Sequence, residues 1–335
     1  MRNKLPTADC QLPIERQFRV VFADSIANRK SPVANGFTLI EITVVVALLS
    51  LIVLALMSVF STTQTAFRAS VTQSDVLEGG RAAMDLMTED LREMAPSYGC
   101  SNSLVIPSGN FPPGIYICNS NNPVNFCVTT NYNYPPLIQP LVGGGQSRTN
   151  ILESFFILSQ GNQDGVPSWY GVGYTVITNM PDGTLYPLYR YSTNLPMAIP
   201  GSAAIIFNNY ETNFLLAPTN WSHLIDGVVD LRIRAYDTNG VWLTNGYAFG
   251  QSNTLQNVLF LPPAAGEVGF YMFSNSLPAS VEIEMATLED RALQRAESLS
   301  ANYLAQSNYL TQQAGRLHVF RQRVSIPNVD PSAYQ

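Results

Sequence analysis

A single carboxylate, Glu41, lies near the start of a long apolar run. The stretch from Gly36 to Phe60 reads GFTLIEITVVVALLSLIVLALMSVF, and its last 19 residues, from Ile42 onwards, carry no charge. A helix that spans a bilayer needs ~20 apolar residues. A charge within hydrocarbon is costly unless it is paired, so Glu41 requires either a partner or a position at the membrane surface.

The residues themselves suggest two explanations for Glu41. At the membrane surface, its carboxylate would lie at a helix N-terminus, where the helix dipole stabilises a negative charge. Alternatively, cleavage between Gly36 and Phe37 would create an α-ammonium group one helical turn away. That ammonium would neutralise Glu41 in the same chain or in a neighbouring one.

The segment before the run, residues 1–36, is basic, and the remainder is acidic. Six basic residues against three acidic ones give +3 before Gly36, and 12 arginines against 21 acidic residues give −9 after it, which together make the −6 of the chain. Basic flanks stay in the cytoplasm, so we expect the acidic remainder to be exported. The acidity argues against nonspecific nucleic-acid binding, and the lack of an A-x-A site argues against an ordinary signal peptide.

The motif Gly36-Phe37-Thr38-Leu39-Ile40-Glu41, followed by an uncharged run, resembles the prepilin processing site of type IV pilin-like proteins. The resemblance implies that residues 1–36 are a cytoplasmic leader, which a membrane-embedded prepilin peptidase removes after Gly36. It further implies that Phe37 becomes an N-methylated terminus. Glu41 would then pair with the terminal amine of an adjacent subunit during assembly. The leader is longer than most in that family.

A helix is expected to continue beyond the apolar half, residues 37–60, through an amphipathic half, residues 61–95. Pro96 disfavours helix at the residue before it, so the helix should end near Met94, and Gly79-Gly80 would permit a bend. Apolar residues recur at helical spacing: Phe67, Val71, Leu77, Met84, Met87, Leu91 and Met94. We expect this stripe to pack on the protein's own sheet rather than to bind a partner. The block EGGRAAMDLMTEDLREM resembles the corresponding helix of J-type pseudopilins and W-type minor pilins.

Residues 96–150 are rich in Asn, Pro and Gly, and they are expected to form an irregular, cysteine-containing loop region. An exported protein meets an oxidising compartment. A disulfide between Cys118 and Cys127 is favoured, and Cys100 remains an alternative partner. No histidine lies nearby to complete a zinc site, so no metal is expected.

Residues 151–335 are expected to form an antiparallel β head. Strands are predicted at 151–160, at 171–178 and 184–192 around the Pro181-Asp182-Gly183 turn, and at 316–327. Two further segments, 226–237 and 280–285, alternate between apolar and polar residues, which predicts strands buried on one face. An [ST]-x-x-[DE] cap at Thr287 predicts a helix over about 288–314, with Gly315 as its stop.

The expected fold class is therefore α+β and pilin-like, with one long N-terminal helix packed on an antiparallel sheet. The order of the body elements loosely resembles J- and W-type pilin-like proteins, and the Verru_Chthon cassette protein C group of prepilin-like proteins. These resemblances predict a minor pilin or pseudopilin of a type II secretion pseudopilus or a type IV pilus, at its tip or initiation complex. Its partners would be the prepilin peptidase, other subunits, the inner-membrane assembly platform and the lipid bilayer.

No enzymatic role is expected. The two histidines, His223 and His318, are far apart, and no H-E-x-x-H, G-x-S-x-G or C-x-x-C motif occurs. Asp237-Thr238-Asn239-Gly240 is a fragment of a calcium-loop pattern without the later ligands, and a hairpin turn is the favoured interpretation. The alternative function is an uncleaved, single-span membrane protein with a periplasmic binding or sensor head.

Overall fold

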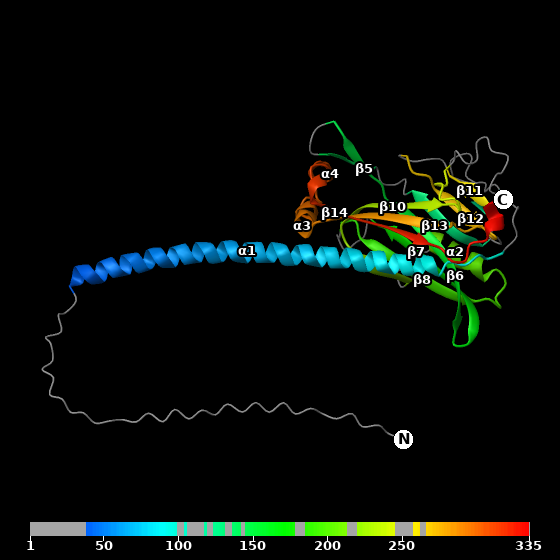
Figure 1. Ribbon diagram of the computed structural model, residues 1–335, viewed down its shortest axis with the longest axis horizontal. Coiled ribbons are helices and arrows are strands. Elements are labelled where there is room, and N and C mark those ends of the chain that lie inside the picture. Colours follow the sequence, from blue (N-terminus) through cyan, green and yellow to red (C-terminus); the bar gives the residue numbers. More distant parts are fainter. Residues whose placement is uncertain are drawn as a thin grey trace, which may run out of the picture. The chain divides into compact units, whose positions relative to one another are not determined.

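The computed structural model shows an α+β protein with a long N-terminal helix and antiparallel sheets (Figure 1). It describes residues 38–98, 104–105, 117–118, 123–130, 136–141, 145–177, 185–212, 220–244, 257–261 and 266–334. The chain divides into two units, Met1–Thr62 and Thr63–Gln335.

Helix α1 runs from Leu39 to Arg92 and contains 54 residues. The prediction of one long helix is confirmed, with both ends about two residues inside the expected limits. The chain leaves the helix where Met94 forms an antiparallel bridge with Ser159, and Ala95 N donates to Leu158 O at 2.9 Å. Pro96 then prevents continuation. The Gly79-Gly80 pair lies within the uninterrupted helix.

A seven-stranded antiparallel sheet forms the larger part of the head, in the order β11-β12-β3-β6-β7-β8-β9. Its strands are β3 (Val124–Thr130), β6 (Glu153–Gln163), β7 (Val166–Val176), β8 (Leu188–Pro196), β9 (Trp221–Ile225), β11 (Val258–Phe260) and β12 (Phe270–Phe273). The predicted hairpin is confirmed as the antiparallel pairing of β7 with β8. Its turn, 181–183, lies outside the described residues.

A second, three-stranded antiparallel sheet has the order β10-β13-β14. Its strands are β10 (Val228–Tyr236), β13 (Ser280–Leu288) and β14 (Leu317–Ser325). All three strands were predicted from their patterns, and in β10 the residues Leu231, Ile233 and Ala235 are buried as expected. The prediction that the other face is open is wrong at Asp230, which is fully buried.

The smaller elements are helices α2 (Ser202–Thr212), α3 (Asp290–Glu297) and α4 (Tyr303–Thr311), the 3-10 turns η3 (Ala314–Arg316) and η4 (Pro331–Tyr334), and four short strands. These strands form two hairpin-like pairs, β1 (Leu104–Val105) with β2 (Ile117–Cys118), and β4 (Leu137–Pro140) with β5 (Ser147–Asn150).

The prediction that residues 96–150 are irregular is wrong in part, because this region supplies β3, which lies inside the large sheet. β3 is buried on both faces, with Phe126 and Val128 on one side and Cys127 on the other. The segment VNFCVTT is short, and the Asn and Pro residues that flank it are typical of loops, so its alternation of Val124, Phe126 and Val128 with Asn125, Cys127 and Thr129 is not recognised as a strand from the sequence. The β4–β5 pair is also ordered, since Gln139 Nε2 donates to Leu310 O of α4 at 2.7 Å.

The single helix predicted over 288–314 is instead two helices, α3 and α4. Thr287 is not a cap, because β13 continues through it, and the N-cap position of α3 is Glu289, whose side chain makes no capping bond. Helix α3 ends at Glu297. Helix α4 then begins at Tyr303, where the side chain of the N-cap residue Asn302 accepts a hydrogen bond from Ala305 N at 3.2 Å. Gly315 lies in η3 rather than directly after a long helix.

The favoured Cys118–Cys127 disulfide is not formed, because Cys127 carries a free, buried thiol. Its side chain packs with Phe156, Phe207 and Tyr210 between the large sheet and α2. Burial raises the pKa of this thiol well above its usual range, with the nearby charge of Glu211 adding to the effect. Cys10 and Cys100 lie outside the described residues, as does the side chain of Cys118.

The large sheet separates two hydrophobic clusters. On β6, Phe155 and Ile157 face α1 and the small sheet, whereas Phe156 and Leu158 face α2. Helix α2 approaches β7 so closely that a Cβ at Gly171 would lie 2.1 Å from the Ile206 side chain. The glycines of the stretch GVGY, residues 171–174 of β7, therefore allow α2 to pack closely on this face of the sheet.

Candidate functional site

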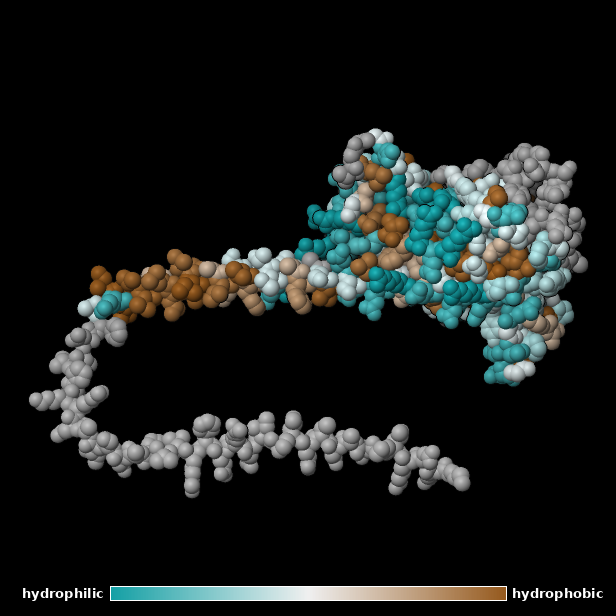
Figure 2. Space-filling view, viewed as in Figure 1, coloured by the Kyte–Doolittle hydropathy of each residue, from teal (hydrophilic) through white to brown (hydrophobic). Residues whose placement is uncertain are grey.

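The first unit leaves its apolar helix surface exposed. In Figure 2, brown side chains cover the visible side of this part of α1. Exposed fractions include 84% at Leu39, 71% at Leu54 and 62% at Phe60, and none of the most apolar window is buried. Among the described residues, one helix, α1, is long enough and apolar enough to span a membrane. An apolar surface of this extent requires lipid or other apolar helices as its surroundings.

Glu41 forms a capping box with Thr38 at the start of α1. Its Oε2 accepts from Thr38 N at 3.1 Å and from Thr38 Oγ1 at 3.0 Å, and Glu41 N donates to Thr38 Oγ1 at 3.4 Å. The T-x-x-E pattern is a sequence signature of this motif, so the local partner of Glu41 could have been predicted. The second oxygen, Oε1, has no partner within the described residues. Gly36 and Phe37 lie outside them.

The second half of α1 docks on the head through the predicted stripe. Met87, Leu91 and Met94 are fully buried, and Met84 is 4% exposed, which confirms that this part of the stripe packs against the protein's own sheets. The prediction is wrong at the start of the stripe, because Phe67 is 71% exposed and Val71 is 47% exposed. Gly80 explains the close fit, because a Cβ there would lie 2.4 Å from the ring of Phe320 on β14.

A bidentate ion pair secures this docking. Arg190 of β8 donates from Nε to Asp90 Oδ2 and from Nη2 to Asp90 Oδ1, both at 2.9 Å. Tyr174 of β7 donates its hydroxyl to the same carboxylate. Burial and the Asp90 charge raise the pKa of Tyr174, and the hydrogen bond to Asp90 raises the pKa of Arg190. Both donors therefore keep their protons at neutral pH.

A second group of buried carboxylates joins the two sheets where β6 meets β10. The strands touch at a parallel bridge between Leu152 and Leu231. Beside it, Asp230 Oδ1 accepts from Ile151 N and Glu153 Oε2 accepts from Ile233 N, each at 2.6 Å. The two carboxyl groups thus take the place of backbone carbonyls as acceptors in a short ladder between diverging strands.

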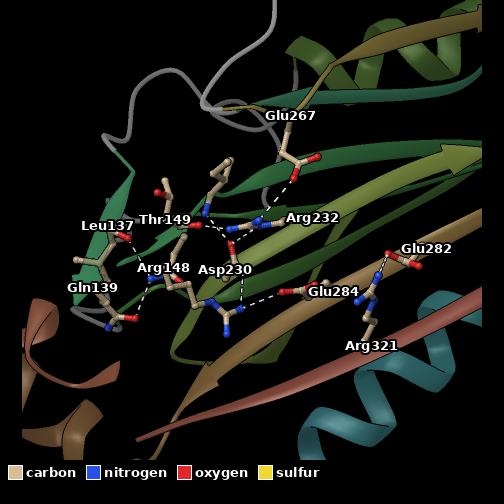
Figure 3. Close-up of polar contacts among 12 residues, drawn as sticks. Leu137, Gln139, Arg148, Thr149, Asp230, Arg232, Glu267, Glu282, Glu284 and Arg321 are labelled. Atoms are coloured by element: carbon tan, nitrogen blue, oxygen red, sulfur yellow. Dashed lines mark hydrogen bonds and ion pairs between the residues drawn. The ribbon is translucent and has the colours of Figure 1, made fainter. Parts of the chain in front are cut away.

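Arginines neutralise most of this junction (Figure 3). Asp230 pairs with Arg148 at 2.7 Å and with Arg232 at 3.1 Å, and Arg148 also reaches Glu284 at 3.1 Å. Glu153 has no ion pair among the described residues, and its Oε1 is buried without a partner. Burial raises the pKa of Glu153 from its usual 4.5 to about 8.

The remaining candidate residues are not brought together. His223 lies 2.8 Å from Asp226, and His318 lies 3.9 Å from Glu289, on separate sheets. Asp237 Oδ1 accepts from Asn239 N and Val241 N, and the Tyr236–Trp242 bridge confirms the hairpin interpretation of this turn. Within the described part of the chain, no group of three or more His, Cys, Asp or Glu residues could hold a metal ion.

Comparison with protein-family models, curated proteins and solved structures found no match. The functional argument therefore depends on the residues of this chain alone.

The docking interpretation predicts that Arg190→Leu destabilises the head by ~3 kcal/mol, because removing one partner leaves a buried charge uncompensated. Urea unfolding of the detergent-solubilised chain measures the loss. Arg92→Leu is the control, since Arg92 lies exposed at the end of the same helix, and it should change stability by less than ~0.5 kcal/mol. Equal effects of the two variants would contradict a role for the ion pair.

The raised pKa of Glu153 predicts that the free energy of unfolding decreases as the pH rises. The folded state holds the Glu153 proton up to pH about 8, whereas the unfolded chain ionises above its usual 4.5. The folded state therefore binds more protons between these values, and stability decreases across that range. Glu153→Gln removes this proton-binding group. The free energy of unfolding of the variant, relative to that of the wild type, should therefore rise from pH 5 to pH 8 by about 4 kcal/mol.

Unfolding curves at pH 5, 6.5 and 8 test this dependence. Glu78→Gln, at an exposed position of α1, is the control and should leave the pH profile unchanged. A Glu153→Gln profile parallel to that of the wild type would show that Glu153 is not the titrating group.

Proposed function

We propose that this chain is a minor pilin or pseudopilin, processed after Gly36 and assembled through α1 into a type II secretion pseudopilus or a type IV pilus. The observation that carries the proposal is the composition of one helix, whose two parts suit different surroundings. The apolar part is exposed throughout and follows the GFTLIE motif, whereas the last turns of the helix, from Gly80 onwards, bury one face in the head. A pilin-like fold is part of this proposal.

The proposed role of the helix is to hold the subunit first in the membrane and then in a filament. The uncharged 19 residues from Ile42 to Phe60 would cross the inner membrane once. The basic leader would stay in the cytoplasm, and the head would lie on the periplasmic side. The Asp90–Arg190 pair would transmit any pull on the helix to the head, because a bidentate pair fixes orientation as well as distance.

Glu41 has two functions in this proposal. Its Oε2 caps the helix through Thr38, and its Oε1 is available to accept the methylated ammonium of a neighbouring subunit. Both interactions reduce the cost of a carboxylate beside hydrocarbon. A head with long hairpins and several loops suits a low-copy position at the tip or initiation complex. The partners are the prepilin peptidase, other pilin subunits, the assembly platform and the lipid bilayer.

The N-terminal peptide mass of the protein from its native membrane tests the processing step. We expect a chain that begins at Phe37 and carries one additional methyl group. Gly36→Ser should leave residues 1–36 attached, because the peptidase cuts after glycine in the family that the motif resembles. An intact leader in wild-type cells with an active prepilin peptidase would contradict the proposal.

The pairing of Glu41 is tested by comparing Glu41→Ala with Thr38→Val. Both variants break the capping box, but only Glu41→Ala removes the acceptor for a neighbouring ammonium. Glu41→Ala should allow cleavage and reduce incorporation into filaments, measured in the sheared surface fraction, whereas Thr38→Val should assemble near the wild-type level. Equal assembly of the two variants would show that Glu41 acts only as a cap.

The second candidate function is an uncleaved, membrane-anchored periplasmic binding or sensor protein. The capping box favours it specifically, because Thr38 already satisfies one oxygen of Glu41 without any processing or neighbour. This candidate requires residues 1–36 to be retained in the mature protein. It also requires Glu41→Ala to leave the localisation and abundance of the chain unchanged.

A further inference from the structure

Strand β14 has an edge without a partner strand among the described residues. It lies last in the order β10-β13-β14 and pairs with β13 along its whole length. Helix α1 covers the inner face of β14, where Gly80 meets the ring of Phe320. The next residue, Arg321, points to the outer face, and 56% of its side chain is exposed.

Two backbone hydrogen bonds determine which amides of β14 face this edge. Ile326 N donates to Ala279 O, and Glu289 N donates to Arg316 O. In an antiparallel pair, residues bonded to the partner alternate with residues whose amides point away. Because both bonds involve even-numbered residues on the β14 side, the odd-numbered amides point to the open edge. These belong to Val319, Arg321, Arg323 and Ser325.

Charges on the outer face alternate from strand to strand. The register forms two rows across β10, β13 and β14, namely Arg234–Glu282–Arg323 and Arg232–Glu284–Arg321. Each row therefore runs positive, negative, positive, and ends with an arginine at the open edge. Figure 3 shows the Arg321 side chain reaching from β14 to Glu282 of the neighbouring strand β13.

The side chains of Arg321 and Arg323 each contact the neighbouring strands, and some of their N–H groups remain without an acceptor among the described residues. Arg323 donates from Nε to Ser280 Oγ at 2.9 Å, and its guanidinium lies 3.8 Å over the ring of Tyr236. It forms no ion pair within the described residues. Arg321 has one carboxylate partner, Glu282, at 2.7 Å. These contacts place both guanidinium groups on the β13 side of β14 rather than beyond its open edge. Because a guanidinium carries five N–H donors, a carboxylate that reaches across β14 from an added strand could bind the donors that remain.

We propose that the edge of β14 binds an extended segment of another polypeptide that carries two carboxylates two residues apart. Such a segment would add a fourth strand, with its backbone bonded to the outward amides of Val319, Arg321 and Arg323. Side chains two residues apart lie on the same face of a strand. The two carboxylates would therefore lie on the same face as the two arginines, in register with both charge rows, and would reach the guanidinium groups across β14.

The sequence of this chain argues for a different polypeptide as the partner. Among its 24 acidic residues, the one pair two positions apart is Glu282 and Glu284, which already lie in β13. A second copy is also disfavoured, because antiparallel pairing of two β14 edges would place arginine opposite arginine. The charges thus oppose self-pairing while favouring an acidic strand. The inference concerns the head alone and does not depend on the proposed function.

Fluorescence anisotropy with the detergent-solubilised full chain tests the proposal. The probe is a capped, labelled peptide, Thr-Val-Glu-Val-Glu-Val-Thr, and its lysine twin replaces both glutamates. The acidic peptide should bind, with an affinity that falls as salt is added, and the lysine twin should not bind. Amide hydrogen exchange should slow at Val319, Arg321 and Arg323 when the acidic peptide is present.

Two variants distinguish the contribution of the arginine charges to binding from that of the backbone N–H groups at the strand edge. Arg321→Gln with Arg323→Gln should weaken binding about fivefold for each arginine removed, as expected for exposed ion pairs. Val319→Pro removes one outward N–H at a position where an edge strand tolerates proline, and it should weaken binding although both arginines remain. The control is Arg291→Gln with Arg295→Gln, which removes two exposed charges from α3.

Circular dichroism and thermal melting establish that each variant is folded. Equal binding of the lysine twin, or equal weakening by the α3 control, would overturn the charge complementarity. Absence of acidic-peptide binding at millimolar concentration would overturn the proposal. Self-association through β14, detected by crosslinking, would show that a second copy is the occupant and would also overturn it. None of these outcomes depends on whether residues 1–36 are cleaved.

Discussion

The bidentate pair between Asp90 and Arg190 is the interaction on which the docking of α1 depends. The stripe of Met and Leu on this helix supplies apolar contact, but methionine side chains are flexible and adapt to many positions. A planar guanidinium accepts a carboxylate in few orientations. The pair therefore fixes the rotation and the axial position of the helix. The Tyr174 hydroxyl donates a third hydrogen bond to Asp90, so both oxygens of this carboxylate have donors.

The two sheets of the head are connected by the same kind of chemistry. Diverging strands cannot continue a backbone ladder, and amides at the divergence would remain unsatisfied. Asp230 and Glu153 supply the missing acceptors for Ile151 N and Ile233 N. Arginines offset the charge of Asp230, whereas Glu153 stays neutral through its raised pKa of about 8. The junction thus combines one carboxyl group that is paired with arginines and one that burial keeps protonated.

Charged residues have different roles in the two units of this chain. In the second unit they hold elements together from inside the head. In the described part of the first unit, residues 38–62, Glu41 is the one charged residue beside a long uncharged surface, with Thr38 as its local partner. The contrast separates a first part of the helix that is long and apolar enough to span a membrane from a last part that packs in a folded domain. It also explains why one helix needs both a cap and a buried ion pair.

The sequence by itself determined the long helix, its exposed apolar half, the buried later part of its stripe, from Met84 to Met94, and the strands with clear alternation. Each of these features repeats at a fixed spacing, and local periodicity is visible in a chain before it folds. Thr38 and Glu41 belong to the same group, because a capping box is also a local pattern.

Only the tertiary structure decided which charges are buried and where the remaining strands lie. Asp90 and Asp230 occupy positions that look exposed in the periodic pattern, and they are buried because arginines from distant strands reach them. β3 lies within the large sheet with both of its faces covered, and even its polar Asn125 is buried, which the residue types of this short segment do not reveal. Contacts between residues far apart in the chain have no local signature, so they follow from packing alone.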